Sequence, residues 1–285
     1  MAFQKIAVLG MGFMGASLAA SMRRFGPSEW QIRGFDPLEG RPAWAVSAGI
    51  VDQAFSNIAQ AVEGADLIVS AAPVDQIVET LVEAARYSRP GAILTDLGST
   101  RERIENALCE MLPKGVIHAG SHPMAGSEKT GPEHCKDILF VGKWIFLTPG
   151  NGNRDGVGND ETLSALAGFW EKLGARVARL GAREHDQIVA TTSHLPHLAA
   201  YALASTLPQK WEEFVAGGFR DTTRIAGGVS EIWTPIFDTN RSSVLEALDQ
   251  YIENLYKWRE ALLKPGTEEI DMLVKKANET RGRLI

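Results

Sequence analysis

KIAVLGMGFMGASLAASMRRFG (residues 5–26) begins with a short apolar run and continues into a stretch of small and apolar residues. Between the two lies GMGFMG, a G-x-G-x-x-G segment. In a strand–turn–helix unit Gly10 allows the tight turn, Gly12 lets the backbone approach a pyrophosphate, and Gly15 lets the helix pack closely on the strand. The N–H groups and the dipole of the helix N-terminus then favour an anion. The stretch therefore predicts a dinucleotide-binding turn.

An acidic residue ends the next apolar run, QIRGFD (31–36). Asp36 lies about 20 residues beyond the last glycine of the turn, where an acidic side chain can bind the ribose hydroxyls of a dinucleotide. Because a carboxylate there repels a 2′-phosphate, we predict NAD rather than NADP, although Arg41 is close enough to keep NADP open. A glycine-rich turn without a ligand is the alternative. The candidate cofactor-binding residues are Gly10, Gly12, Phe13, Met14, Gly15, Asp36 and Ser99.

Six short apolar runs alternate with stretches long enough to hold crossover helices. They are KIAVLG (5–10), QIRGFD (31–36), ADLIVSAAP (65–73), AILTDLGS (92–99), VIHAGS (116–121) and WIFLTP (144–149). Continuous apolar strands separated by helices indicate a parallel sheet that is covered on both faces, with right-handed, doubly wound connections. NGNRDGVGND (151–160) reads as a surface loop. A helix and a strand over residues 161–181 are expected to complete the sheet.

The sequence pattern changes near residue 182. Beyond it, helical patterns follow one another without a convincing strand. The longest pattern, over residues 242–264, has apolar residues at three- and four-residue spacing, which is typical of an amphipathic helix. They are Val244, Leu245, Leu248, Tyr251, Ile252, Leu255 and Trp258. We therefore predict an α/β fold, with a Rossmann-type dinucleotide-binding domain over residues 1–181 and an all-α domain over residues 182–285.

Composition excludes several classes of protein. The 285 residues carry a net charge of -6, which argues against a nucleic-acid partner. No run approaches the roughly 18 apolar residues of a membrane span, and the glycines of the first turn do not suit a signal peptide. Cys109 and Cys135 lie far apart, so a reducing compartment is favoured over a disulfide. We predict a cytoplasmic protein without a membrane anchor.

The loop GSHPMAGSEKTG (120–131) places a histidine among glycines and small polar residues. His122 follows the VIHAGS run, and Ser99 ends the strand before it, so both should lie at the carboxyl ends of parallel strands, where the cleft of such a sheet opens. Gly120 and Gly126 would allow the close approach of a ligand. A loop histidine with a local hydrogen bond is the alternative. The pattern favours a loop that presents an imidazole to a ligand.

Two further segments carry candidate binding residues. EHDQIVATTSHLPHLAAYALAS (184–205) is expected to be a helix with a kink or a restart at Pro196, and His194 and His197 share one of its faces. They could form a metal pair, but without H-E-x-x-H or a cysteine cluster we predict no metal.

The second segment is GGFRDTTRIAGG (217–228), in which Arg220 and Arg224 lie four residues apart. A guanidinium in this setting is suited to bidentate capture of a carboxylate. The alternative is a surface salt bridge with Asp221 or Asp186.

Together these motifs resemble the prephenate/arogenate dehydrogenase family of tyrosine biosynthesis, from about residue 5 to residue 262. The motifs that carry the resemblance are GMGFMG, DLGST, SHPMAGSEKTG, EHDQIVATTSHLPH and GFRDTTRIA, in the family's order and approximate spacing. The resemblance implies a Rossmann-type domain and a helical domain that forms a homodimer. It also implies NAD-dependent oxidative decarboxylation of prephenate to 4-hydroxyphenylpyruvate, of arogenate to tyrosine, or of both.

The resemblance also implies roles for individual residues. His122 is the expected catalytic histidine, which accepts a hydrogen bond and then the proton from the 4-hydroxyl as hydride leaves C4, and Ser99 is expected to bind the same hydroxyl. Carbonyl character at C4 then lets the ring carboxylate leave as CO2. The implied substrate-binding residues are Arg224 for a carboxylate, Asp186 to orient it, His197 lining the site, His194 near it and Glu128 shaping the pocket. Where the family often has lysine this chain has Arg101, which keeps the charge but not its geometry.

Two other functions compete with this reading. A β-hydroxyacid-type dehydrogenase would need a lysine base on the first helix of the second domain, and residues 184–205 contain none. A non-catalytic NAD-binding dimer module would keep the glycine turn but would not need Ser99, His122 and Arg224 in one cleft. Prephenate and arogenate differ only in a keto group or an ammonium far from the hydride, so the choice between them stays open.

Overall fold

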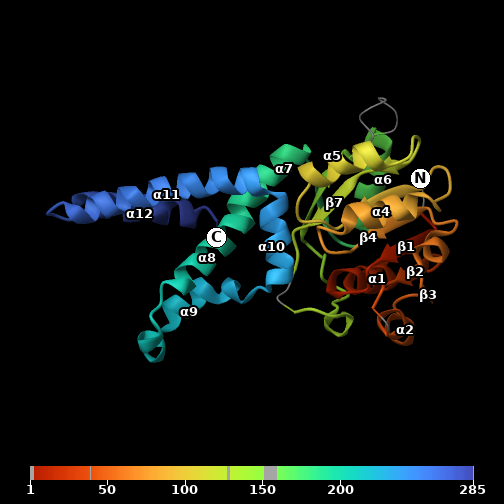
Figure 1. Ribbon diagram of the computed structural model, residues 1–285, viewed down its shortest axis with the longest axis horizontal. Coiled ribbons are helices and arrows are strands. Elements are labelled where there is room, and N and C mark those ends of the chain that lie inside the picture. The colour runs from red at the N-terminus through yellow and green to blue at the C-terminus, as the bar shows by residue number, and fades with distance from the viewer. Residues whose placement is uncertain (1–2, 39, 127–128, 151–158, 285) are drawn as a thin grey trace.

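The computed structural model describes residues 3–38, 40–126, 129–150 and 159–284. An N-terminal part that contains all the strands lies beside a helical C-terminal part, whose longest helices extend away from the sheets (Figure 1). Within the described residues, no helix is both long and apolar enough to cross a membrane.

Six parallel strands form the first sheet. They are β1 (Lys5–Leu9), β2 (Gln31–Phe35), β3 (Gln53–Phe55), β4 (Leu67–Ser70), β5 (Ile93–Asp96) and β6 (Ile117–His118). Their order is β3-β2-β1-β4-β5-β6, so the winding direction reverses between β1 and β4. In such sheets ligands bind outside the carboxyl ends of the strands at this reversal. The parallel, doubly wound arrangement confirms the predicted fold class, although the short edge strand β3 was not anticipated.

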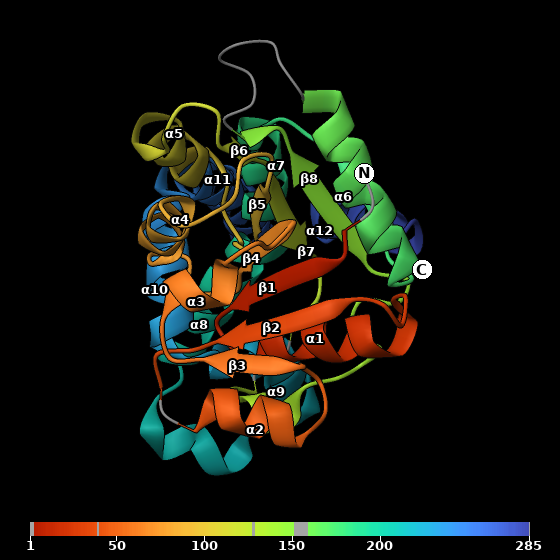
Figure 2. The same ribbon diagram turned by 90° about the vertical axis from the view of Figure 1, so that its right-hand side faces the viewer.

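Helices cover both faces of this sheet (Figure 2). They are α1 (Phe13–Phe25), α2 (Arg41–Ser47), α3 (Ile58–Val62), α4 (Ile77–Ala85) and α5 (Glu102–Met111). Because successive side chains of a strand point to opposite faces, Ile6 and Val8 of β1 enter one hydrophobic core and Ala7 and Leu9 enter the other. This double burial explains why the strands read as continuous apolar runs.

The prediction that every strand joins one parallel sheet is wrong for the last part of the domain. Residues 116–121 split into β6 and β7 (Gly120–Pro123), and β7 belongs to a second sheet with β8 (Trp144–Thr148) and β9 (Arg176–Arg179). β7 and β8 run antiparallel, while β8 and β9 run parallel. Helix α6 (Asn159–Lys172) packs on this sheet. Most of the predicted loop over residues 151–160 lies outside the described residues.

Beyond residue 181 the described chain forms helices only, as predicted. They are α7 (Ala182–Val189), α8 (Leu195–Ser205), α9 (Gly217–Thr223), α10 (Ser230–Thr239), α11 (Arg241–Leu263) and α12 (Glu268–Gly282), with shorter turns between them. Pro196 does not restart the helix, because a π-helical turn over Ala190–His194 joins α7 to α8 directly. Ile236 of α10 enters the same hydrophobic core as α3, α4 and α5, which anchors the helical part to the first sheet.

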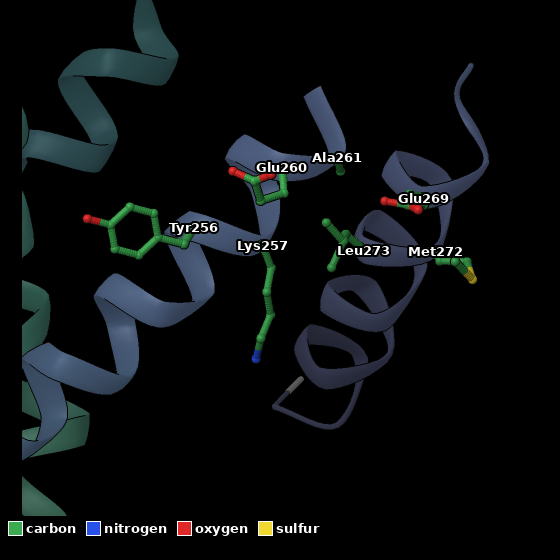
Figure 3. Close-up of a pocket in the computed structure, with 7 residues that line it drawn as sticks. All are labelled: Tyr256, Lys257, Glu260, Ala261, Glu269, Met272 and Leu273. Carbon is green, nitrogen blue, oxygen red and sulfur yellow. The ribbon is translucent and has the colours of Figure 1, made fainter. Parts of the chain in front are cut away.

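Much of the apolar stripe on α11 is uncovered. Val244 is buried, whereas Leu245 and Leu255 are 52% and 48% exposed. α12 packs beside the distal part of α11, and an open hollow between the two helices has a largely apolar lining (Figure 3). Its lining residues are Tyr256, Lys257, Glu260, Ala261, Glu269, Met272 and Leu273. None of the predicted site residues is among them, so this hollow is separate from the chemistry that the motifs suggest.

Candidate active site

The glycine-rich turn connects β1 to α1 at the point where the winding of the sheet reverses. Gly10 has φ +105°, and a Cβ atom on it would lie 2.8 Å from the main-chain oxygen of Ala71. A Cβ atom on Gly15 would lie 1.8 Å from the main-chain oxygen of Gly10, so the close packing of helix on strand excludes a side chain. Gly12, in contrast, faces open space apart from Arg41 at 3.9 Å. The turn thus has one open side, where a ligand could reach the backbone.

Phe13 and Met14 turn their side chains away from that open side. Phe13 is buried in the core, and Met14 packs against it. Their N–H groups belong to the first turn of α1, which begins after Gly12 and has no earlier helical carbonyl to bind. These two residues can therefore bind an anion only through their backbone N–H groups.

Asp36 follows β2 and is fixed against the same turn. Its Oδ2 accepts a hydrogen bond of 2.7 Å from the N–H of Met11, and its Oδ1 accepts one of 2.9 Å from Leu38. A guanidinium nitrogen of Arg41 lies 3.3 Å from Oδ2. The acidic residue and its neighbouring arginine thus lie together at the edge of the glycine turn.

His122 lies on β7 and forms a hydrogen bond to a residue that the sequence analysis did not single out. Its Nδ1 is 2.7 Å from Nε2 of His185 on α7, and Nδ1 of His185 is 2.8 Å from Oδ1 of Asp186. A hydrogen bond of 2.9 Å between the hydroxyls of Ser121 and Thr95 fastens β7 to β5. The structure therefore brings together a His–His–Asp series from two distant segments.

Burial lowers the pKa of His122 well below its ordinary value, and the neighbouring His185 lowers it further. Burial also lowers the pKa of His185, although the hydrogen bond to Asp186 opposes this. With both rings neutral, the carboxylate of Asp186 accepts the Nδ1–H of His185, and Nε2 of His185 accepts the Nδ1–H of His122. The lone pair of His122 is then on Nε2, which bonds no other described residue.

Asp186 does not orient Arg224, contrary to what the resemblance implied. It is buried, and besides His185 it accepts hydrogen bonds from the N–H groups of Arg101 (2.8 Å) and Glu102 (2.9 Å) at the start of α5. Through these three contacts the carboxylate of Asp186 links His185 to the N-terminus of α5. In the sequence, only the adjacent histidine and aspartate at positions 185 and 186 could have indicated this contact.

His194 and His197 both lie beside Trp233, but each has a hydrogen-bond partner of its own. Nδ1 of buried His194 lies 3.2 Å from the side-chain nitrogen of Asn240, which also donates to the main-chain oxygen of Asp186. Burial lowers the pKa of His194 to about 4. The ring of His197 stacks on Trp233, with centroids 3.6 Å apart. Among the described residues, no group of three or more histidines, cysteines and acids is arranged to hold a metal ion.

The two arginines of the third segment are exposed, and neither forms an ion pair with a described residue. The alternative of a salt bridge with Asp221 or Asp186 is therefore absent from the described part of the chain. Burial lowers the pKa of His197, and the charge of Arg224 lowers it further, against the opposing effect of a hydrogen bond to the carbonyl of Ser193. Arg224, which has no ion-pair partner within the described ranges, thus brings a positive charge close to His197.

Ser99 follows β5 and is partly exposed, with no hydrogen bond to a described residue. Glu128 lies outside the described residues. Gly120 is not open to a ligand, contrary to prediction, because a Cβ atom there would lie 2.1 Å from a guanidinium nitrogen of Arg101. Gly126 faces open space. The buried side chain of Arg101 therefore requires a glycine at this position of the strand that carries His122.

Two family models match successive parts of this chain. The family model described as "Prephenate dehydrogenase, nucleotide-binding domain" matches residues 18–179, and the model described as "Prephenate dehydrogenase, dimerization domain" matches residues 181–276. A cyclohexadienyl dehydrogenase of Zymomonas mobilis is 29% identical, with 98% of this chain and 94% of that protein covered.

Two solved structures resemble the whole fold. The prephenate dehydrogenase of Aquifex aeolicus, in complex with hydroxyphenyl propionate and NAD+, is 30% identical with a TM-score of 0.90, covering 100% of this chain and 99% of that one. The arogenate dehydrogenase of Synechocystis is 28% identical with a TM-score of 0.84, covering 99% of this chain and 100% of that one.

Proposed function

Because the chain belongs to the prephenate/arogenate dehydrogenase family, we propose that it oxidises and decarboxylates prephenate, arogenate or both with NAD, and that His122 accepts the proton of the ring hydroxyl. The observation that carries the role of His122 is its hydrogen bond to His185, which in turn binds Asp186. Family membership also removes the two competing functions, a β-hydroxyacid-type dehydrogenase and a non-catalytic module.

The residues around the glycine turn suit NAD. The open side of Gly12 and the N–H groups at the start of α1 would hold the pyrophosphate, and Asp36 would bind the ribose hydroxyls. Bound NAD supplies the acceptor for the hydride that leaves C4 of the substrate ring. Since Arg41 is paired with Asp36 rather than free, we propose that NAD is preferred over NADP.

Side chains of this protein accept the proton of the substrate hydroxyl and later return it. Nε2 of neutral His122 accepts the proton of the 4-hydroxyl while the C4–H bond breaks, and the O–H electron pair forms the C4 carbonyl. The positive charge then shared by His122 and His185 is stabilised by the carboxylate of Asp186. When the C–C bond to the ring carboxylate breaks, its electrons make the ring aromatic, CO2 leaves, and His122 can return the proton to the phenolate oxygen.

We assign substrate binding to residues of the family motifs. Arg224, exposed and without an ion pair among the described residues, would bind a substrate carboxylate, and His197 would line the same side. Ser99 would donate to or accept from the 4-hydroxyl. His194, held by Asn240, lies close by, and Glu128 is proposed to shape the entrance.

We also propose that the helical part forms a homodimer, in keeping with the family description of this region as a dimerization domain. The exposed apolar side chains of α11 support this, because a second copy would remove them from water. Light scattering of the purified protein would give the mass, and a monomer at micromolar concentration would contradict the proposal.

The function is tested by following NADH formation with prephenate and arogenate in parallel, and by repeating each assay with NADP. We expect turnover of at least one substrate with NAD, and the ratio of kcat/KM values assigns the preference. Binding of NAD without turnover of either substrate would contradict the proposal. Equal kcat/KM with NADP would refute the assigned role of Asp36.

A further inference from the structure

Arg101 is a fully buried arginine at the start of α5. Its guanidinium pairs with both oxygens of Asp96 at the end of β5, with one distance of 3.0 Å, and its Nε donates to the main-chain oxygen of Thr100. Both partners of the ion pair have zero exposure. Buried ion pairs of this kind contribute little net stability, because desolvation offsets their attraction.

Two glycines make the space that this guanidinium occupies. A Cβ atom on Gly98 would lie 2.5 Å from one of its nitrogens, and a Cβ atom on Gly120 would lie 2.1 Å from the other. Gly120 is on β7, two residues before His122. The charged group of Arg101 thus packs directly against the strand that carries the proposed base.

The main chain of Arg101 reaches the other end of the same histidine series. Its N–H donates to Oδ1 of Asp186, the oxygen that also accepts from His185. One residue therefore contacts both the strand that holds His122 and the carboxylate that orients its partner.

Charged and titratable groups surround this centre from every element packed against it. They are Asp96 on β5, Glu105 on α5, His118 on β6, His185 and Asp186 on α7, and His194 in the π turn. Among them Arg101 supplies the positive charge that opposes protonation of the two histidines, whereas Asp96 favours it. After burial and the effect of His185, the charge of Arg101 contributes to the low pKa of His122.

We propose that Arg101 is a positioning residue for catalysis: its guanidinium packs against β7 at Gly120, its N–H holds the carboxylate of Asp186, and it places a positive charge beside the strand that carries His122. This inference rests on the proposed role of His122. A planar guanidinium suits this slot, because it can pair with both oxygens of Asp96.

The test is the pH dependence of kcat/KM for the variants R101Q and R101K, with R103Q as a matched control. Arg103 lies two residues further along the chain, in the first turn of α5, but it is exposed and pairs with Asp238. In R101Q we expect the acid limb of the profile to move to higher pH by on the order of 1 unit, because a cation has been removed. In R101K the charge remains, so the limb should stay near that of the wild type. R103Q should match the wild type.

A purely structural role for Arg101 predicts a different result. R101Q would then lose stability or kcat, while the acid limb of its surviving activity would stay in place, and this outcome would overturn the proposal. If R101Q does not fold, D96N decides, since removal of the carboxylate should move the limb to lower pH; an unmoved limb would overturn the proposal equally. Failure of the underlying function is distinguishable, because the wild-type protein itself would then show no turnover.

Discussion

Nδ1 of His122 and Nε2 of His185 lie 2.7 Å apart, although 63 positions separate the two residues in the chain. Their rings meet edge to face, with centroids 5.0 Å apart. Because Asp186 fixes the proton of His185 on Nδ1, the only donor that can complete this contact is Nδ1–H of His122. The contact therefore decides which nitrogen of His122 is free to act as a base.

Replacing His122 by asparagine should lower kcat steeply, by about 100-fold or more, because positioned acid–base catalysis typically contributes at least this factor. NAD affinity, measured by calorimetry or fluorescence titration, should be unchanged, since the glycine turn lies elsewhere. Near-normal turnover would remove His122 from its proposed role.

Replacing His185 by phenylalanine should lower kcat by less than the loss in H122N while leaving KM for the substrate unchanged. The new ring can pack on Phe146, which already lies 5.7 Å from the ring of His185, but it cannot accept from His122. The tautomer of His122 is then no longer fixed. Glutamine at the same position offers a carbonyl acceptor and should restore part of kcat, whereas equal activity of both variants would argue against the tautomer explanation.

Replacing Arg224 by alanine should raise KM much more than it lowers kcat, because the carboxylate contact already exists in the bound ground state. Arg220 provides the matched control, since it is also exposed and has no ion pair with a described residue. R220A should resemble the wild type in steady-state kinetics. The reverse pattern would assign the carboxylate to Arg220.

Alanine at Gly12 and at Gly15 should have opposite consequences. In G15A the new Cβ would lie 1.8 Å from the oxygen of Gly10, so α1 must move and the free energy of unfolding should fall. In G12A the Cβ meets open space, so denaturant unfolding should stay near that of the wild type while NAD affinity drops. A G12A variant that binds NAD normally would show that the pyrophosphate does not approach this glycine.

Mild acid should destabilise the folded protein. The pKa values of His122, His185 and His194 are all lowered in the folded state, the last to about 4, whereas in the unfolded chain each returns towards 6.5. As pH falls below about 6.5 the unfolded state binds more protons, and the free energy of unfolding must decrease.

Urea unfolding at pH 7.5 and at pH 5 measures this difference before most carboxylates titrate. H194F should reduce the difference, while asparagine at His134, a partly exposed histidine outside the site, should leave it unchanged. Equal stability of the wild-type protein at both pH values would contradict the neutral, buried state of these rings.

Local sequence patterns were sufficient to predict much of the fold. The strand–turn–helix unit at residues 5–26 and the five further apolar runs depend on neighbouring residues, so they can be read directly. β3 was missed because three residues at a sheet edge leave almost no periodicity. The break between β6 and β7 was missed because apolar residues continue through Ala119, while the change of sheet occurs beside a guanidinium from residue 101.

The candidate site was less accessible from the sequence. Motifs drew attention to His122 and Arg224, but not to His185, whose partners come from β7 and the adjacent residue. The expected link between Asp186 and Arg224 came from the family resemblance, and nothing in the sequence indicated that the start of α5 supplies two of the donors to Asp186. The faces of the helix over residues 184–205 were also hard to assign, because a π turn interrupts its regular spacing.

That turn also limits how the segment can change over evolution. A π turn contains one residue more than the α-helical turn it replaces. Loss of a single residue from Ala190–His194 would restore a regular helix, but it would rotate everything after it by about 100°. His197 would leave Trp233, and Tyr201 would lose its hydrogen bond to the carbonyl of Gly228. A substitution in this segment changes one side chain and leaves the positions of the others as they are. An insertion or deletion between Asp186 and His197 would displace every residue that follows, so the length of this segment is constrained.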